Sequence, residues 1–184
     1  MDRRFRRRDP ETEARNEGKF KVLVVDGNLR SQRTMQRVLS ADPEIVVVGT
    51  HKRGRSALQY LRFNKVDLVF LNPELGDING FDLFSYLNDP PLVVIVSDRY
   101  DYGYFAFKIG AIAFINTDFT HKEFRDVIKR SREEVDRRRV YQEYLAAKEL
   151  EAEKEKELAA AKAKEQAVAK EKEREARRSE KKEE

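Results

Sequence analysis

Four apolar runs of the sequence each lead into a polar residue that could take part in chemistry. Asp26 follows FKVLVV, Asn72 follows LVFL and Ser97 follows LVVIV. Thr117 follows the run AIAFIN. A carboxylate can bind a cation or attack a phosphoryl group, whereas an amide or a hydroxyl mainly exchanges hydrogen bonds. Whether these four residues form one site depends on the elements that position them.

Five apolar runs rich in Val, Ile and Phe have the length and composition of strands that are buried on both faces. They span residues 20–26, 44–50, 66–71, 92–97 and 111–116. Helical spacing occupies 29–40, 54–63, 80–88 and 102–109. A further helix begins at Thr120, which forms a capping box with Glu123. The alternation predicts an α/β fold with a five-stranded parallel sheet and helices on both faces.

In a parallel sheet of this kind, ligands bind at the carboxyl ends of the strands, where the strand order reverses. The residues at these ends are Asp26-Gly27, Asn72, Ser97 and Asn116-Thr117. These ends are therefore where the sequence predicts the functional site.

Residues 19–131 resemble the receiver domains of bacterial two-component response regulators. The resemblance rests on VLVVDG, DLVFLNPELGDINGFDL and VVIVSDRYDYGYFAFKIGAIAFINTDF, which stand in the family's order and spacing. It implies a flavodoxin-like, doubly wound receiver fold, followed here by a long charged C-terminal helix. In the family an acidic pair ends the first strand, a phosphorylated aspartate the third, Thr or Ser the fourth, and Lys-Pro the fifth. The corresponding residues here are Asp26-Gly27, Asn72, Ser97 and Thr117-Asp118.

Asn72 therefore stands where the family has its phosphoacceptor aspartate. Because an amide oxygen is a poor nucleophile, Asn72 is not expected to accept phosphate. Gly27 and Thr117 replace a second carboxylate and the lysine, which removes family partners of both magnesium and the phosphoryl group. Deamidation of Asn72 by the usual route is blocked because Pro73 has no N–H. These changes predict a phosphorylation-independent pseudo-receiver that is not an enzyme and has neither a cofactor nor a metal site.

The retained pocket residues also have structural interpretations. Asp26 can cap the following turn or hydrogen-bond Ser97, and we expect such a role rather than metal binding. Ser97, Phe114 and Thr117 stand at switch positions of the family. With no phosphoryl group to follow, Phe114 is expected in the core. The two histidines, His51 and His121, have no ligand-spaced partner, which favours structural roles.

The segment 97–110 is unusually rich in aromatic residues. Helical spacing directs Tyr102, Phe105 and Ile109 toward the sheet, so other rings should be exposed. In the family, the fourth helix, fifth strand and fifth helix form the face that binds partners, and aromatic side chains are enriched at such contacts. The candidate partner face comprises Tyr100, Tyr102, Tyr104 and Phe107. The alternative is that these rings only cover the seam between helix and sheet.

Composition divides the 184 residues into three parts. Residues 1–18 form an Arg-rich arm that is expected to be disordered, 19–131 form the receiver-like domain, and 132–184 form a charged helical extension that is expected to fray after Lys170. No cysteine is present, which excludes disulfides, thiolate metal sites and thiol catalysis. No apolar run approaches the roughly 20 residues that span a bilayer, so we expect a cytoplasmic protein without a membrane partner.

The extension has neither Gly nor Pro and is rich in strong helix formers. Its best heptad seam includes Val140, Tyr144 and Leu158, but Glu151 and Lys154 fall on the same seam. A coiled coil, a solvated single helix and a partly disordered tail therefore stay open.

The sequence as a whole predicts a signalling adaptor that binds protein partners, with a homodimer through 97–145 as one form. One alternative is a nucleic-acid-associated regulator that uses RRFRRR in the arm and the basic residues 137–139. The other is an atypical receiver that is still modulated by phosphate or metal.

Overall fold

The computed structural model describes residues 18–183. The chain divides into two compact units, Met1–Val135 and Asp136–Glu184. Residues 1–17, which make up nearly all of the predicted Arg-rich arm, lie outside the described residues.

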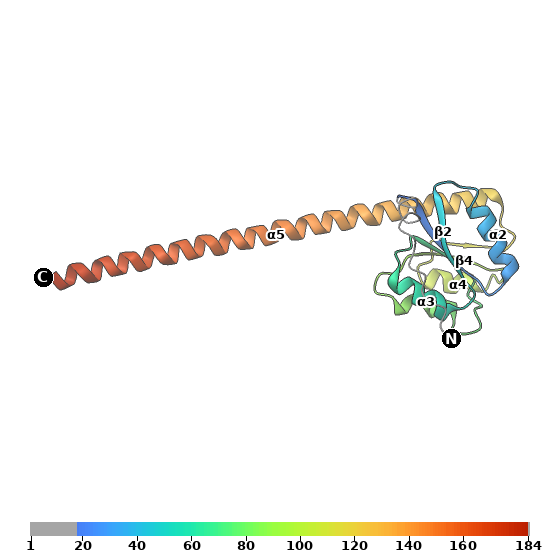
Figure 1. The fold of residues 1–184 in the computed structure, drawn as a ribbon, viewed down its shortest axis with the longest axis horizontal. Coiled ribbons are helices and arrows are strands. Elements are labelled where there is room, and N and C mark those ends of the chain that lie inside the picture. The colour runs from blue at the N-terminus through green and yellow to red at the C-terminus, as the bar shows by residue number, and fades with distance from the viewer. Residues whose placement is uncertain (1–17, 184) are drawn as a thin grey trace, which may run out of the picture. The chain divides into compact units, whose positions relative to one another are not determined.

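The first unit contains the parallel five-stranded sheet that the sequence predicts (Figure 1). Its strands lie in the order β2-β1-β3-β4-β5, so the order reverses beside β1. The strands are β1 Phe20–Val25, β2 Ile45–His51, β3 Leu68–Leu71, β4 Leu92–Val96 and β5 Ala113–Ile115. All four pairings are parallel, and β1, β3 and β4 form the buried centre of the sheet.

Helices cover both faces of this sheet because alternate side chains of each strand point to opposite faces. On one face, α2 (Leu29–Leu39) and the first turns of α5 (His121–Glu183) pack on Val22, Val24 and Phe70. On the other face, α3 (Gly54–Phe63), η1 (Gly80–Tyr86) and α4 (Tyr102–Lys108) pack on residues of the opposite parity, such as Leu23 and Val69. The fold is therefore a doubly wound α/β sandwich of flavodoxin-like type.

The predicted helix at 80–88 differs from the observed element. The chain forms a 3-10 helix, η1, that begins at Gly80 and ends at Tyr86. Asn79 caps it by accepting a hydrogen bond from the N–H of Phe81. Gly80 lies so close to Pro73 that a Cβ atom on it would come within 2.6 Å of the Pro73 Cα. This close approach to the loop after β3 leaves no room for a larger residue at the start of η1.

The capping box predicted at the start of α5 is confirmed. Glu123 accepts hydrogen bonds from the N–H and hydroxyl of Thr120, and the Thr120 hydroxyl accepts from the N–H of Glu123. Further along, Arg132 joins α5 to the loop before β2 through Asp42 and Glu44, at 3.1 and 2.6 Å. These contacts lie within the first unit and tie the start of α5 to the sheet.

The second unit is the remainder of α5, which continues to Glu183. The helix continues past Lys170, and the fraying that the sequence predicts there stays a prediction. The absence of Gly and Pro explains why nothing interrupts it. Val140, Tyr141 and Tyr144 are exposed, at 61%, 59% and 59%. The described part of this unit thus has an uncovered apolar strip, and the coiled coil stays a prediction.

None of the helices in the described part of the chain is both apolar and long enough to span a bilayer.

Candidate functional site

The carboxyl ends of the strands surround an open cleft. Its lining includes Asp26 and Gly27 after β1, Asn72 after β3, and Thr117 after β5. The sequence therefore identified residues that the fold brings together. Ser97 is buried below this rim, and Phe114 packs into the core on the α3 and α4 side of the sheet.

Asp26 is buried at the end of β1 and caps the turn into α2. Its Oδ1 accepts a hydrogen bond of 2.8 Å from the N–H of Asn28, and its carbonyl accepts one from the side chain of Gln32. Asn28 in turn caps α2 by accepting from the N–H of Arg30. The predicted capping role of Asp26 is therefore present in the structure.

Gly27 occupies the second position of the family's acidic pair, and the space around it is small. A Cβ atom on Gly27 would lie 3.2 Å from the carbonyl oxygen of Glu74. The backbone after β3 thus approaches the end of β1 closely. An aspartate or glutamate at this position would have to displace that backbone by a few tenths of an ångström.

Asn72 uses its side-chain oxygen to organise the loop after β3. Its Oδ1 accepts a hydrogen bond of 3.0 Å from the N–H of Glu74, two residues on, which is the geometry of an Asx turn. The Asn72 N–H donates to the carbonyl of Val25 at 2.8 Å, which continues the β1–β3 ladder. The oxygen at the phosphoacceptor position is therefore committed to a backbone hydrogen bond.

Ser97 plays the corresponding part after β4. Its Oγ accepts a hydrogen bond of 3.2 Å from the N–H of Arg99, again two residues on. Two strand-end side chains, Asn72 and Ser97, thus each close a turn, and each turn places a charged residue at its exit. These charged residues are Glu74 and Arg99.

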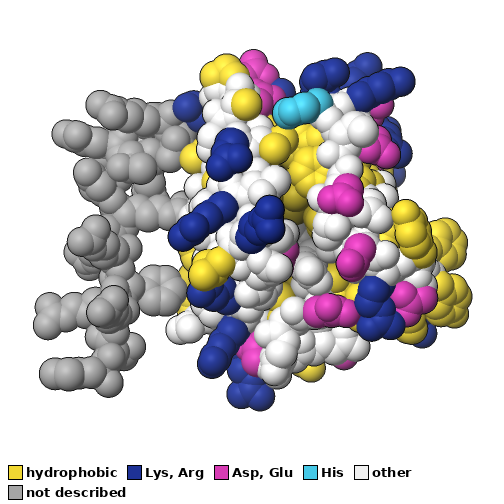
Figure 2. Space-filling model, turned by 90° about the vertical axis from the view of Figure 1, so that its right-hand side faces the viewer, with side chains coloured by type: hydrophobic (Ala, Val, Ile, Leu, Met, Phe, Trp, Pro, Cys, Tyr) yellow, Lys and Arg dark blue, Asp and Glu magenta, His cyan; other side chains and the backbone are white. Residues whose placement is uncertain are grey.

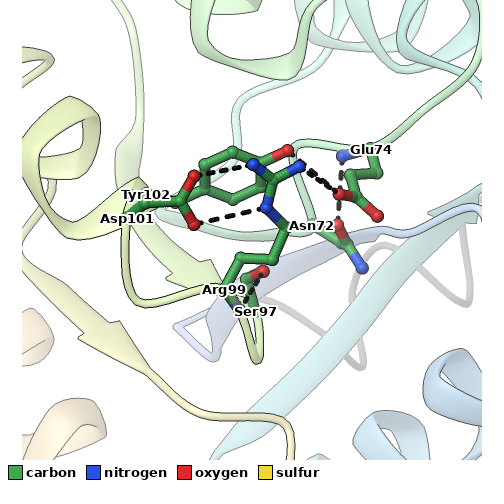
Figure 3. A network of polar contacts seen from close by, with 6 residues as sticks. All are labelled: Asn72, Glu74, Ser97, Arg99, Asp101 and Tyr102. Carbon is green, nitrogen blue, oxygen red and sulfur yellow. Dashed lines mark hydrogen bonds and ion pairs between the residues drawn. The ribbon is translucent and has the colours of Figure 1, made fainter.

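Glu74 and Arg99 meet across the carboxyl edge of the sheet (Figure 3). Arg99 Nη1 donates to Glu74 Oε1 at 3.3 Å, while its Nη2 and Nε donate to the two oxygens of Asp101. Tyr102 donates its hydroxyl proton to the same Glu74 oxygen at 2.9 Å, and the guanidinium lies 4.3 Å from the centre of its ring. The network joins the loop after β3 to the start of α4.

The network changes the protonation equilibria of its members. The hydrogen bond and charge of Asp101 raise the pKa of Arg99, and the hydrogen bond from Arg99 lowers the pKa of Asp101. Burial raises the pKa of Tyr102, and its hydrogen bond to Glu74 raises it further. At neutral pH these shifts keep Asp101 as a carboxylate, Arg99 as a guanidinium and Tyr102 as a neutral phenol.

Sequence reasoning singled out Tyr102 but missed Glu74, Arg99 and Asp101. A usable signal was present, because both Glu74 and Arg99 follow a strand-end Asn or Ser by two residues, the spacing of Asx and ST turns. Their meeting depends on strand order, since β3 and β4 are neighbours in the sheet.

Thr117, at the family's lysine position, is exposed and has local contacts. Its hydroxyl donates to Asn116 Oδ1 at 3.3 Å, and that oxygen also accepts from the N–H of Asp118. Asn116 donates to the hydroxyl of Tyr100. The position thus supports a turn after β5 and carries no positive charge.

The residues present do not fit the magnesium ion that the family binds. Asp26 is the one carboxylate of the former acidic pair, and one of its oxygens already accepts from Asn28. The oxygen of Asn72 is committed to Glu74, and Gly27 offers no side chain. Among the described residues, no group of three or more His, Asp or Glu side chains is arranged to hold a metal ion. Of the three positions at Asp26, Gly27 and Asn72, one therefore offers a charged oxygen to a hard divalent cation, where the family supplies more.

The aromatic segment on α4 divides into two sets of rings. Tyr100, Tyr104 and Phe107 are exposed, at 77%, 68% and 85%. Tyr102 is half-buried against Phe81, with ring centres 5.2 Å apart. The prediction that some of these rings are exposed is confirmed. The predicted inward stripe is wrong at Phe105, which is 43% exposed because the buried position of this short helix falls on Ala106.

A doubly wound parallel sheet with its polar cleft at the strand ends defines a receiver-type α/β domain. The sequence model of the response regulator receiver domain matches residues 22–129, more than half of the chain. The chain therefore belongs to the response regulator receiver family.

Curated relatives agree with this assignment. The sensory transduction protein LytT of Bacillus anthracis is 30% identical over 114 residues, which cover 60% of this chain and 46% of LytT. A protein-glutamate methylesterase/protein-glutamine glutaminase of Desulfotalea psychrophila is 32% identical over 103 residues, 52% of this chain and 28% of that protein. The chain thus spans less than half the length of these relatives.

Solved structures show the same fold. The response regulatory domain of MrkE from Klebsiella pneumoniae has a TM-score of 0.59 at 20% identity and covers 64% of this chain and 98% of its own. The receiver domain of a NarL response regulator from Mycobacterium tuberculosis has a TM-score of 0.56 at 26% identity, covering 62% and 97%. Both likenesses lie in the receiver part of the chain.

Proposed function

We propose that this chain is a phosphorylation-independent pseudo-receiver that acts as a protein-binding adaptor in a two-component-like pathway. The observation that carries the proposal is the hydrogen bond from the N–H of Glu74 to Asn72 Oδ1. A phosphoacceptor needs a free, negatively charged oxygen, and this oxygen is neutral and engaged. Two further positions support the proposal. Gly27 lacks the second acidic side chain of the family site, and Thr117 lacks the positive charge of the family's lysine.

The Glu74–Arg99 ion pair supports the same proposal. In an active receiver the phosphoryl group on the residue after β3 attracts the hydroxyl after β4. Here an ion pair between the two loops connects the same strand ends without a phosphoryl group. Information would then be carried by the surface of the domain rather than by a chemical signal.

The surface that we assign to partner binding is the aromatic patch, defined as Tyr100, Tyr104 and Phe107. Exposed aromatic side chains are uncommon on a surface that stays in water, and Tyr and Phe are enriched in protein interfaces. On the face drawn in Figure 2, exposed hydrophobic side chains border a row of acidic ones. A partner that covered the patch would remove large apolar areas from water.

A pull-down with the whole chain as bait tests this function. We expect Tyr104→Ser with Phe107→Ser to lose captured proteins, whereas the matched control Tyr86→Ser, 56% exposed on η1, keeps them. Capture that is unchanged in the double variant would contradict the assignment of the patch. Capture that requires prior treatment with a phosphoryl donor would contradict the phosphorylation-independent function.

A further inference from the structure

A second surface lies on the opposite side of α4 from the aromatic patch. It is a groove of ≈ 470 Å³ between α4 and the loop after β3. Its main lining residues are Glu74, Leu75, Ile78, Phe81, Tyr102 and Phe105. Tyr102 and Phe105 are three residues apart and share one face of α4, whereas none of Tyr100, Tyr104 and Phe107 lines the groove.

The loop wall of the groove is held in place by several contacts. Glu74 and Asn79 form an isolated antiparallel bridge, and the turn between them passes through Gly76, whose φ of +75° suits glycine. Leu75 is buried, and Asp77 accepts hydrogen bonds from the N–H groups of Gly54 and Arg55 at the start of α3. The wall is thus preorganised, which lowers the entropy cost of binding.

The other wall is positioned by the polar network. Arg99 and Glu74 hold Tyr102 so that its ring meets Phe81 edge to face, and Phe81 also contacts Phe105 at 5.3 Å between ring centres. The floor is therefore aromatic and only partly covered. A large apolar side chain could insert there and bury further area.

The charges around the groove determine which residues a ligand can have next to its inserted apolar side chain. Glu74 lines the groove and shares the guanidinium of Arg99 with Asp101, so two carboxylates face one positive charge in this ion-pair group. Glu74 uses only Oε1 in the network, and among the described residues its Oε2 has no hydrogen-bond partner. Its side chain is 55% exposed. This oxygen can accept a charge-assisted hydrogen bond from an incoming Lys or Arg.

We infer that the groove binds a cationic peptide segment of a partner protein, with one large apolar side chain on the floor and Arg or Lys beside Glu74. This inference rests on the proposed adaptor function and assigns that function a partner chemistry. Binding in the groove requires both a positive charge and one inserted side chain of the ligand, which binding at the aromatic patch does not. The two surfaces can therefore be tested separately.

The test is a fluorescence anisotropy titration of the whole chain with three labelled peptides, RRFRR, RRARR and EEFEE. We expect saturable binding of RRFRR, binding of RRARR weaker by about tenfold, and none of EEFEE. Glu74→Gln should weaken RRFRR by at least about fivefold and Phe105→Ala by about tenfold, whereas Phe107→Ala leaves it unchanged. Circular dichroism and thermal unfolding establish that each variant is folded.

Equal affinity for RRFRR and RRARR, or equal loss in the Phe105→Ala and Phe107→Ala variants, would overturn the inference. Absence of binding would also overturn it. If RRFRR binds only after the arginines of residues 3–8 are replaced by Ser, the occupant is this chain's own arm and a separate partner is contradicted. None of these outcomes bears on phosphate uptake or on pull-down through the aromatic patch, so failure here is distinguishable from failure of the adaptor function.

Discussion

Arg99 and Glu74 lie 3.3 Å apart and connect the two loops that a receiver normally couples through a phosphoryl group. Each residue is placed by a turn that Ser97 or Asn72 closes with its side chain. Two residues at the family's reactive positions therefore have a structural use in this chain. This relationship makes several quantities measurable.

The energy of the ion pair should be small. Because the Arg99 and Glu74 side chains are 51% and 55% exposed, water screens the pair, and we expect a coupling energy of less than about 1 kcal/mol. A double-mutant cycle with Arg99→Gln and Glu74→Gln, measured by urea unfolding, gives this value. The pKa of Tyr102 should fall toward 10.0 in Glu74→Gln, since the variant replaces a negatively charged acceptor with a neutral one. A coupling energy near zero together with an unchanged Tyr102 pKa would contradict the network.

The close approach of Gly80 to Pro73 predicts a strong effect of one methyl group. The Cβ of Gly80→Ala would lie 2.6 Å from backbone atoms, so we expect a loss of about 1–3 kcal/mol in the free energy of unfolding. Gly103→Ala is the matched control, because nothing lies within 4 Å of its Cβ and its helical position should gain about 0.5 kcal/mol. Equal stabilities of the two variants would show that the loop after β3 does not pack as described.

Protonation of His51 should destabilise the fold. Burial lowers the pKa of His51 below 6.5, so the unfolded chain binds a proton that the folded chain resists. The contribution of neutral His51 to the free energy of unfolding is then fully present above pH 6.5. It decreases as the pH falls through the pKa that His51 has in the folded state. Urea unfolding at pH 7 and pH 5 should show this loss, and His51→Gln should reduce the difference. An equal loss in wild type and in His51→Gln would show that the loss does not come from His51.

Arg132 should matter more to stability than a surface arginine further along α5. Its side chain is 28% exposed, contacts Asp42 and Glu44, and lies 5.6 Å from the centre of the Phe20 ring. We expect Arg132→Gln to cost about 1 kcal/mol or more, and Arg139→Gln, whose pair with Asp136 is exposed, to cost close to nothing. Thermal unfolding of the two variants compares them. Similar unfolding temperatures would argue against an anchoring role for Arg132.

The strands and most helices followed from the sequence because their signals are local. The type and order of the elements follow from apolar runs such as LVVIV, from the capping box of Thr120 and Glu123, and from the spacing between such signals. The strand-end residues Asp26 and Asn72 were placed correctly in one cleft, since parallel strands put their carboxyl ends at one edge. Family resemblance then identified the fold as flavodoxin-like and doubly wound, and the strand order came from the structure.

The parts that escaped prediction depend on contacts distant in sequence. The 3-10 form of η1 is linked to the contact between Gly80 and Pro73, and the polar network needs residue 99 to meet residue 74. The exposure of Phe105 reflects the short length of α4, which buries only Ala106. Helical periodicity cannot report these features, because the first two depend on contacts between distant loops and the third on the length of the helix.

The proposed pseudo-receiver function requires that Asn72, the residue after β3, does not take up phosphate. The direct measurement is the intact mass of the whole chain after incubation with acetyl phosphate and magnesium. We predict an unchanged mass, in wild type and in Asn72→Ala alike. A gain of about 80 Da, the mass of one phosphoryl group, that disappears in Asn72→Ala would contradict the central claim.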